Sequence, residues 1–351
     1  MKRLSVVHLL SLLGCVFFFL LSGCGEVELS PGETPAERFG TITGRICAPT
    51  GDAWLENAYI YVNLVDEAGL ISGIRETYSD PDGYFVLSKL PEGAAVTLYI
   101  QKGTWQTSQE AYVEEGKVTA LPTPPCLDPL SVNAAVVTGE FDSFSRILEE
   151  LGIANHIVID GNQPSAVASF FGNLELLLGF DVICLNGGML EGAVLSDEVA
   201  VANLEAYVKA GGTLFATDWA YDWVEHAFPG AIDFLGDDSQ TDAAQLGVAA
   251  LIEGRVVDQS LAAYVGSSTV GLRYDLAYWP VIEGAVPQVV VHVSGDVQYY
   301  DEGELVQSLS AAPLLVSFSS GYGTVIYSTF RGEANLSDDT TRILQYMLYK
   351  I

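Results

Sequence analysis

The chain is short of positive charge. Its 351 residues include 15 lysines and arginines against 45 aspartates and glutamates, which gives a formal net charge of −30 at pH 7. So acidic a protein repels the phosphates of nucleic acids and the anionic head groups of lipids. We therefore expect no nucleic-acid partner, and any contact with a membrane must come from something other than a basic patch.

Signatures of common catalytic sites are also scarce. The sequence has four histidines and contains no HExxH pair, no Gly-x-Ser-x-Gly elbow and no P-loop. The sequence therefore lacks the usual signatures of a zinc peptidase, an α/β-hydrolase and a P-loop ATPase. We expect no cofactor, and the dispersed carboxylates favour a solubilising surface over a cation site.

Long low-complexity tracts are missing as well. Hydrophobic residues make up 49% of the chain and charged residues 17%, which is typical of a folded protein. The length predicts more than one domain. The chain is therefore expected to be globular and multidomain.

The first residues are arranged as a secretory signal. Lys2 and Arg3 precede a nearly unbroken apolar stretch over 6–21. This stretch is short for a membrane span, which needs roughly 20 residues. The segment Leu21-Ser22-Gly23-Cys24 follows it and resembles the lipobox of bacterial lipoproteins. An earlier candidate box ending at Cys15 would leave too short an apolar core.

The lipobox resemblance implies a membrane anchor. In that family the cysteine thiol, here Cys24, receives a diacylglycerol, the chain is cut before it, and the new amine is acylated with a fatty acid such as palmitate. Two or more acyl chains hold a protein at a membrane where one would be marginal. Gly25 is not the Asp that retains some lipoproteins at the inner membrane, so we expect an outer-membrane, lipid-anchored protein of the cell envelope. Ordinary signal cleavage and an uncleaved anchor are the alternatives.

Composition changes suggest four segments. They are a signal peptide over 1–23, a lipidated N-terminus and tether over 24–40, a small antiparallel β-sandwich over 41–127 and an α/β domain over 128–351. The second segment is polar and bears prolines, which is typical of a flexible linker. The third alternates short β-rich runs with turn signatures such as Asp80-Pro81-Asp82-Gly83.

Residues 41–127 resemble carboxypeptidase regulatory-like domains. The resemblance rests on four short segments, which occur in the order that this family shows: Gly44-Arg45-Ile46, Ala58-Tyr59-Ile60-Tyr61-Val62, Asp82-Gly83-Tyr84-Phe85 and Leu90-Pro91-Glu92-Gly93. Such domains lack peptidase chemistry despite their name. The resemblance therefore implies a spacer or a binding module.

Two cysteines mark the ends of this third segment. Cys47 ends its first expected strand and Cys126 closes its last. An exported chain meets an oxidising compartment, so a Cys47–Cys126 disulfide is expected. Two independent buried thiols are the alternative, because sequence alone does not establish that the residues are close.

Beyond the stiff segment Pro122-Thr123-Pro124-Pro125, apolar strands alternate with amphipathic helices. Such βα repeats predict an α/β, doubly wound, mainly parallel sheet of flavodoxin-like type, with a binding crevice at the carboxyl ends of its strands. The expected strands are 132–138, 156–159, 181–185, 213–217, 288–293, 314–318 and 324–329, and the expected helices include 144–151, 199–210 and a last one through 342–347.

This segment resembles the class I glutamine amidotransferase-like superfamily. The resemblance lies in the segments 180–188, 207–215 and 323–330, which correspond to an oxyanion-loop strand, the approach to a nucleophile elbow and a late strand. At the elbow the sequence has Asp218, which cannot act as the thiolate nucleophile, and Arg331 stands where the histidine would be. Cys184 lies within an expected apolar strand, and this context favours a buried thiol over a nucleophile. The implied domain is therefore catalytically degenerate.

Candidate binding residues cluster around this elbow. Asp218, Asp222 and His226 are spaced i, i+4 and i+8, so on a helix they would share a face and are weak candidates for a metal site. Aromatic residues beside carboxylates are typical of sugar or peptide recognition, and also of core packing. The candidate binding set is Asn186, Gly187, Gly188, Asp218, Trp219, Tyr221, Asp222 and Arg331, with 274–280 as a possible second aromatic wall and 237–242 as a less favoured calcium loop.

The sequence therefore predicts a lipoprotein without catalysis. Its β-sandwich would present an amidotransferase-like domain that binds a carbohydrate, a peptide or an envelope protein, and its membrane contact would be the N-terminal lipid. One alternative is an envelope hydrolase that uses Asp218, Asp222 and His226, with or without a metal. Another is a purely architectural lipoprotein.

Overall fold

The computed structural model describes residues 38–51, 54–66, 68–140, 144–190, 192–236, 240–301, 305–331 and 338–349. Cys24, the signal segment and most of the tether lie outside the described residues, so their assignments stay predictions. Of the helices in these ranges, none has both the length and the apolar character that a membrane crossing requires.

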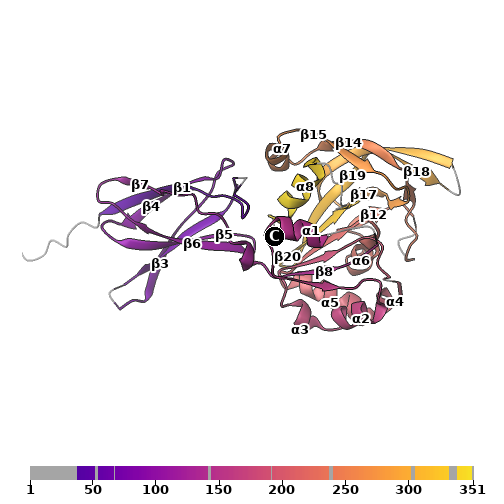
Figure 1. The fold of residues 1–351 in the computed structure, drawn as a ribbon, viewed down its shortest axis with the longest axis horizontal. Helices are drawn as coiled ribbons and strands as arrows, with labels where there is room; N and C mark the ends of the chain where they lie inside the picture. Colours follow the sequence, from indigo (N-terminus) through magenta and orange to yellow (C-terminus); the bar gives the residue numbers. More distant parts are fainter. Residues whose placement is uncertain are drawn as a thin grey trace, which may run out of the picture. The chain divides into compact units, whose positions relative to one another are not determined.

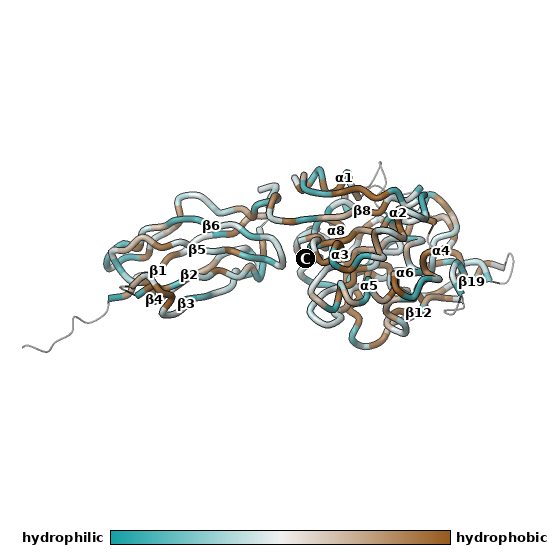
Figure 2. Tube along the Cα trace, turned by 90° about the horizontal axis from the view of Figure 1, so that it is seen from below, coloured by the Kyte–Doolittle hydropathy of each residue, from teal (hydrophilic) through white to brown (hydrophobic). Residues whose placement is uncertain are grey.

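The first described part consists of two sheets (Figure 1). One has the order β4-β1-β7, and the other has the order β3-β2-β5-β6. Their strands are β1 (Phe39–Arg45), β2 (Tyr59–Val65), β3 (Ile71–Tyr78), β4 (Tyr84–Pro91), β5 (Ala95–Lys102), β6 (Trp105–Tyr112) and β7 (Val118–Ala120). Along each strand, side chains alternate between the two faces of the sheet. Ile42 on β1, Ile60 on β2 and Ile100 on β5 point inward and belong to one buried cluster. Figure 2 shows the matching alternation of hydrophobic and hydrophilic residues along these strands.

The turn before β4 is fixed by one carboxylate. Asp80 Oδ1 accepts hydrogen bonds from the backbone N–H groups of Asp82 at 3.0 Å and Tyr84 at 2.9 Å. Gly83 has φ 78°, and a Cβ there would lie 2.8 Å from the carbonyl oxygen of Ile46. The Asp-Pro-Asp-Gly sequence thus supplies both the side-chain acceptor and the glycine that this turn requires.

The predicted disulfide between Cys47 and Cys126 is confirmed. Backbone hydrogen bonds run alongside it, from Cys47 N to Pro125 O at 3.1 Å and from Leu127 N to Cys47 O at 3.1 Å. The bond therefore joins the chain just after β1 to the chain just after the last strand of the two sheets. It closes a loop whose ends are 79 residues apart in sequence.

The second described part contains an eleven-stranded mixed sheet, whose main order is β15-β14-β18-β19-β20-β11-β10-β8-β9. Neighbours from β20 to β9 pair in parallel, and neighbours from β15 to β20 pair antiparallel. The strands of this part are β8 (Ala134–Val137), β9 (His156–Ile159), β10 (Val182–Leu185), β11 (Thr213–Thr217), β12 (Ile232–Phe234), β13 (Leu246–Gly247), β14 (Ala250–Val256), β15 (Thr269–Tyr274), β16 (Trp279–Pro280), β17 (Ile282–Ala285), β18 (Val290–Asp301), β19 (Leu305–Ser320) and β20 (Gly323–Ser328).

The predicted doubly wound, mainly parallel α/β fold is wrong. Strands account for 44% of the structure and helices for 22%. The segment between α6 and β20 adds long antiparallel strands where βα units were expected. The longest of them, β18 and β19, pair with each other over most of their length. Because these strands pair antiparallel, the sheet is mixed and not mainly parallel. Because they are long, more of the chain is in strands than in helices.

Helices cover both faces of the parallel strands (Figure 1). Val136 and Val182 lie in one hydrophobic cluster with residues of α1 and α8, while Val137 and Ile183 lie in the other with residues of α2 and α5. The helices are η1 (Pro129–Ser131), α1 (Phe144–Glu150), α2 (Pro164–Phe171), α3 (Leu174–Leu177), α4 (Gly192–Leu195), α5 (Glu198–Lys209), η2 (Asp218–Ala220), α6 (Tyr221–Ala227), α7 (Gln259–Val265) and α8 (Asp338–Leu348).

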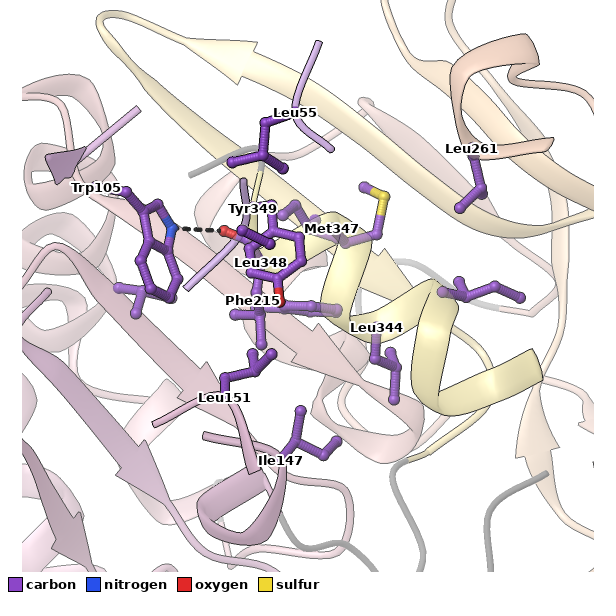
Figure 3. Packing of buried hydrophobic residues seen from close by; sticks show 14 of the residues in the cluster. Leu55, Trp105, Ile147, Leu151, Phe215, Leu261, Leu344, Met347, Leu348 and Tyr349 are labelled. Carbon is purple, nitrogen blue, oxygen red and sulfur yellow. Dashed lines mark hydrogen bonds between the residues drawn. The ribbon is translucent and has the colours of Figure 1, made fainter. Parts of the chain in front are cut away.

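Trp105 on β6 packs against the end of α8. Its indole Nε1 donates to the carbonyl oxygen of Leu348 at 3.1 Å, and its ring lies edge-on to that of Tyr349 (Figure 3). Trp105 is 0% exposed. One hydrophobic cluster therefore extends from the two small sheets to α1 and α8.

We predict that the disulfide contributes strongly to stability. In the chain-entropy account, a loop of this length corresponds to about 4 kcal/mol of unfolding free energy. A Cys47→Ser/Cys126→Ser variant should therefore unfold at a lower guanidinium concentration than the oxidised protein. Reduced wild-type protein serves as the control and should unfold with the double variant. An unchanged midpoint on reduction would contradict the assignment.

Candidate functional site

A pocket of about 290 Å³ lies at the carboxyl ends of β11 and β20. Segments that are far apart in sequence meet there: the turn after β11, the end of β15 with the turn that follows it, and the residues after β20. Its lining residues are Asp218, Trp219, Arg273, Tyr274, Leu276, Ala277, Tyr278, Trp279, Thr329, Phe330 and Arg331. The pocket includes three residues of the predicted binding set, Asp218, Trp219 and Arg331, and much of the predicted second aromatic wall.

Asp218 lies at a tight strand-to-helix turn. It follows β11 directly and has φ 47°, the left-handed region that residues with a side chain seldom adopt. Asp218 as a whole is 2% exposed. The backbone is held there by Tyr327, whose hydroxyl donates to the carbonyl oxygen of Asp218 at 2.9 Å. Strained residues of this kind are concentrated at binding and catalytic sites, although the strain does not itself specify a function.

The Asp218 carboxylate is paired with Arg331. Arg331 Nη1 lies 3.3 Å from Asp218 Oδ2, and Nη2 of the same guanidinium lies 3.5 Å from Asp275 Oδ1. The side chains of Arg331 and Asp218 are 12% and 3% exposed. A charge buried to this extent requires a partner, because its transfer out of water costs several kcal/mol. The predicted elbow and the predicted late-strand position are therefore in direct contact.

Aromatic rings form much of the pocket wall. Trp219 Nε1 donates to the carbonyl oxygen of Tyr278 at 2.7 Å, which joins two lining segments. The rings of Tyr274 and Trp279 lie 4.2 Å apart. The hydroxyl of Tyr274 is 2.7 Å from Thr329 Oγ1, and burial raises the Tyr274 pKa, so this hydroxyl stays protonated at neutral pH. The wall is thus rigid and combines ring surfaces with a few polar atoms.

The predicted Gly-Gly loop lies behind Asp218 and does not line the pocket. A Cβ on Gly187 would lie 2.9 Å from Asp218 Cβ and 3.2 Å from Asp218 Oδ2. Gly187 therefore permits the close approach of the two turns. Asn186, at 1% exposure, is buried in the same region, and Gly188 has φ 80°.

Tyr221 and Trp223 lie in the core. Both are 0% exposed, and the Tyr221 hydroxyl accepts a hydrogen bond from Ala244 N at 3.0 Å. Trp223 packs against the ring of Phe171 at 4.2 Å. Neither lines the pocket, so of the aromatic residues around the elbow it is Trp219 that faces the candidate site.

Asp222 and His226 lie together on α6, but Asp218 is not in their group. Asp222, Glu225 and His226 place ligand atoms within 4.8 Å of one another, which is close enough to hold a metal ion. His226 Nδ1 is 2.9 Å from the carbonyl oxygen of Asp222, which leaves Nε2 as the ligand nitrogen. This set of oxygen and nitrogen atoms would suit a transition metal. Of the predicted calcium loop over 237–242, residues 237–239 lie outside the described residues.

A second polar series was not found from the sequence. Asp258 Oδ2 is 2.8 Å from His292 Nδ1, and His292 Nε2 is 2.7 Å from Ser317 Oγ. The three residues are 25 or more positions apart and form no motif, so only the pairing of β18 with β19 and the start of α7 bring them together. His292 is 2% exposed and Ser317 does not line the pocket. We assign this series to the anchoring of α7 on the sheet.

Arg273, Asp275 and Thr329 were also absent from the predicted set. Asp275 lies within the predicted aromatic wall over 274–280 and Thr329 within the late-strand segment 323–330, but neither was given a role, and the residues come together because β15 ends beside the segment after β20. A close pairing of that kind depends on tertiary contacts. The signal available in the sequence was limited to the run of aromatic residues over 274–280.

No protein-family model and no curated protein matches the chain. Among solved structures, a cytoplasmic protein from Salmonella typhimurium is similar at 14% identity and a TM-score of 0.40, over 63% of this chain and 99% of that one. PurLQS from Thermotoga maritima is similar at 13% identity and a TM-score of 0.38, over 62% and 97%. For 3-chlorocatechol 1,2-dioxygenase from Rhodococcus opacus 1CP, the values are 15% and 0.19, over 22% and 44%. Similarity at this level carries no argument about activity.

We predict that acid stabilises the folded protein through Asp222. Burial raises the pKa of this carboxyl from 3.8 to about 6, so the folded state binds more protons than the unfolded state between these values. The free energy of unfolding should therefore fall by about 2 kcal/mol as pH rises from 4 to 6. Asp222→Asn should flatten this part of the pH profile, measured by denaturant titration. Asp233→Asn, in an exposed position, is the control and should leave the profile unchanged.

Proposed function

We propose that the protein is a cell-envelope lipoprotein that binds a small hydroxylated ring compound, such as a sugar, in the pocket beside Asp218 and Arg331. The observation that carries this proposal is the composition of the pocket. A guanidinium and two carboxylates meet at one edge, and aromatic rings form the adjoining wall. A volume of about 290 Å³ suits a ligand of one or two rings.

Polar groups in and beside the pocket can form hydrogen bonds with hydroxyl groups. Asp275 is not a lining residue, but it adjoins the lining residue Arg331 at 3.5 Å, and its side chain is 45% exposed, so its carboxylate can accept from a ligand hydroxyl at the pocket edge. Arg331 offers guanidinium donors beside it. The C–H edges of a sugar ring would pack on Trp219 or Tyr278, because the face of an aromatic ring is negative. Arg273 adds a second guanidinium to the lining, so the pocket carries charges of both signs.

The proposal includes the absence of amidotransferase catalysis. Asp218 stands at the elbow position and is engaged with Arg331, and a carboxylate does not supply the thiolate chemistry of that family. The relationship to amidotransferase-like proteins, and that of the first two sheets to carboxypeptidase regulatory-like domains, are parts of this proposal. The position of Asp218 at a left-handed strand-to-helix turn supports the first of them.

The lipid anchor completes the proposal. Cys24 would carry the acyl chains, and the segment 24–40 would act as a short tether at the outer membrane. The acidity of the chain supports an anchor made of lipid, since its surface would be repelled by anionic head groups.

We predict that neutral sugars bind at the pocket and that Tyr278→Ala and Asp275→Asn each weaken binding. The expected loss is about tenfold for either variant, because one ring contact or one charged hydrogen bond is removed. Isothermal titration calorimetry with a panel of neutral mono- and disaccharides provides the measurement. Tyr322→Ala removes a tyrosine that is 92% exposed and lies outside the pocket, so it should bind as the wild type does. Absence of binding across the panel would favour an architectural lipoprotein.

We also predict that Cys24 is the acylation site. Cells that express the chain and are fed an alkyne-bearing fatty acid should yield labelled protein in the membrane fraction. The Cys24→Ser variant should lose the label and leave that fraction, while Cys15→Ser should keep both properties. Equal labelling of the Cys24→Ser variant would refute the assignment.

A further inference from the structure

The outer face of the β3-β2-β5-β6 sheet carries a row of tyrosines. Tyr59 on β2 pairs with Tyr78 on β3, and Tyr61 on β2 pairs with Tyr99 on β5. Residues between them, such as Ile60 and Ile100, are buried in the cluster between the sheets. Because side chains alternate along a strand, the four tyrosines lie on the opposite, solvent-facing side.

The rings touch in an unbroken series. Ring centroids are 5.2 Å apart for Tyr78 and Tyr59, 5.1 Å for Tyr59 and Tyr61, and 5.1 Å for Tyr61 and Tyr99. We refer to these four residues as the tyrosine row. Contacts of this kind hold each ring against its neighbours. Binding of a ligand would therefore cost little conformational entropy, because the rings are already ordered.

The row is accessible to a large ligand. The end members Tyr78 and Tyr99 are 61% and 37% exposed, and the two central rings are half-buried against each other. The hydroxyl of Tyr59 donates to Glu76 at 2.5 Å, and this hydrogen bond raises the Tyr59 pKa to about 12. The row therefore offers ring surface together with a Tyr59 hydroxyl that is held as a donor to Glu76.

The residues around the row are mainly hydrogen-bonding groups, with Ile74 and Tyr112 as exposed hydrophobic residues, and by the strand register none carries positive charge. By the strand register, its outward neighbours include Asn63, Gln101, Gln106, Ser108, Glu76 and Glu110. Across the four described strands, the lysine and arginine residues Arg75 and Lys102 occupy the inward-alternating positions. This face thus carries two carboxylates and uncharged amides or hydroxyls, and it would repel an anionic polymer.

We infer that the tyrosine row binds an uncharged polysaccharide chain. The C–H faces of sugar rings pack on aromatic rings, and sugar hydroxyls form hydrogen bonds with amides and carboxylates. An open face has no walls, so one sugar would bury little surface, whereas a chain can contact successive tyrosines across three strands. This inference does not rest on the pocket beside Arg331, which lies in the other described part and holds a different set of residues.

A protein partner fits this face less well. The centres of protein interfaces are depleted in charge and often include arginine beside the aromatic residues. Here Glu76 is paired directly with a tyrosine of the row, and most neighbouring outward positions are polar, with Ile74 as an exposed apolar residue. Neutral glycans match both properties, since they carry many hydroxyls and no charge.

The test is native affinity electrophoresis of the full mature chain in detergent. Gels would contain soluble β-glucan, α-glucan, xylan or galactomannan, with polygalacturonate as an anionic polymer. We expect at least one neutral polymer to retard the wild type, and Tyr61→Ala/Tyr99→Ala to raise the dissociation constant about tenfold or more. Near-ultraviolet circular dichroism would show that the double variant is folded.

Two matched variants separate the outcomes. Tyr322→Ala removes a more exposed tyrosine elsewhere and should be retarded as the wild type is. Tyr278→Ala impairs the pocket and should also be retarded normally, so failure of the pocket proposal would not be mistaken for failure of this one. The inference is overturned if no neutral polymer retards the folded wild type, if only polygalacturonate does, or if the double variant binds as well as the wild type.

Discussion

A buried carboxylate that must have a partner organises the centre of the molecule. Asp218 is almost fully enclosed, and a charge in that position is tolerated only when another charge or several hydrogen bonds compensate for lost water. Arg331 supplies the opposite charge through one guanidinium nitrogen, and a second nitrogen of the same group contacts Asp275. The ends of β11, β15 and β20 are thereby brought to one place. The pocket is a consequence of this requirement, because its walls are the segments that carry these three residues.

Small residues and strained backbone serve the same arrangement. Gly187 leaves room for the Asp218 side chain, and the left-handed φ of Asp218 turns the chain from β11 into η2. A thiolate nucleophile needs an open position and an adjacent base, whereas this carboxylate is enclosed and neutralised by a guanidinium. The same turn that could present a nucleophile is here part of a fixed wall. That physical difference is why binding is a better interpretation than catalysis.

The sequence predicted the buried strands well and the antiparallel ones poorly. β8, β10 and β11 are continuous apolar runs buried at every position, and such runs are visible in a sequence. β14 and β15 instead alternate between exposed and buried residues, and their partners are set by tertiary pairing. The predicted parallel fold failed in this segment. For the site, the family resemblance pointed to Asp218 and Arg331. The segments that hold Asp275 and Thr329 were also noted, but the meeting of these segments and the burial of Tyr221 depend on packing that no local pattern records.

The pocket and the tyrosine row follow from opposite physical conditions. In the pocket, enclosure makes each polar group costly to leave unsatisfied, so a small ligand can be recognised by few contacts. On the open sheet each contact is weak because water remains close, and affinity can come only from several contacts along one ligand. Trp105 and the disulfide hold the ends of the two small sheets by buried interactions, and ring contacts among the tyrosines add a smaller stabilising contribution on the outer face. On our proposal, the four tyrosine rings on this face also bind a ligand that spans them.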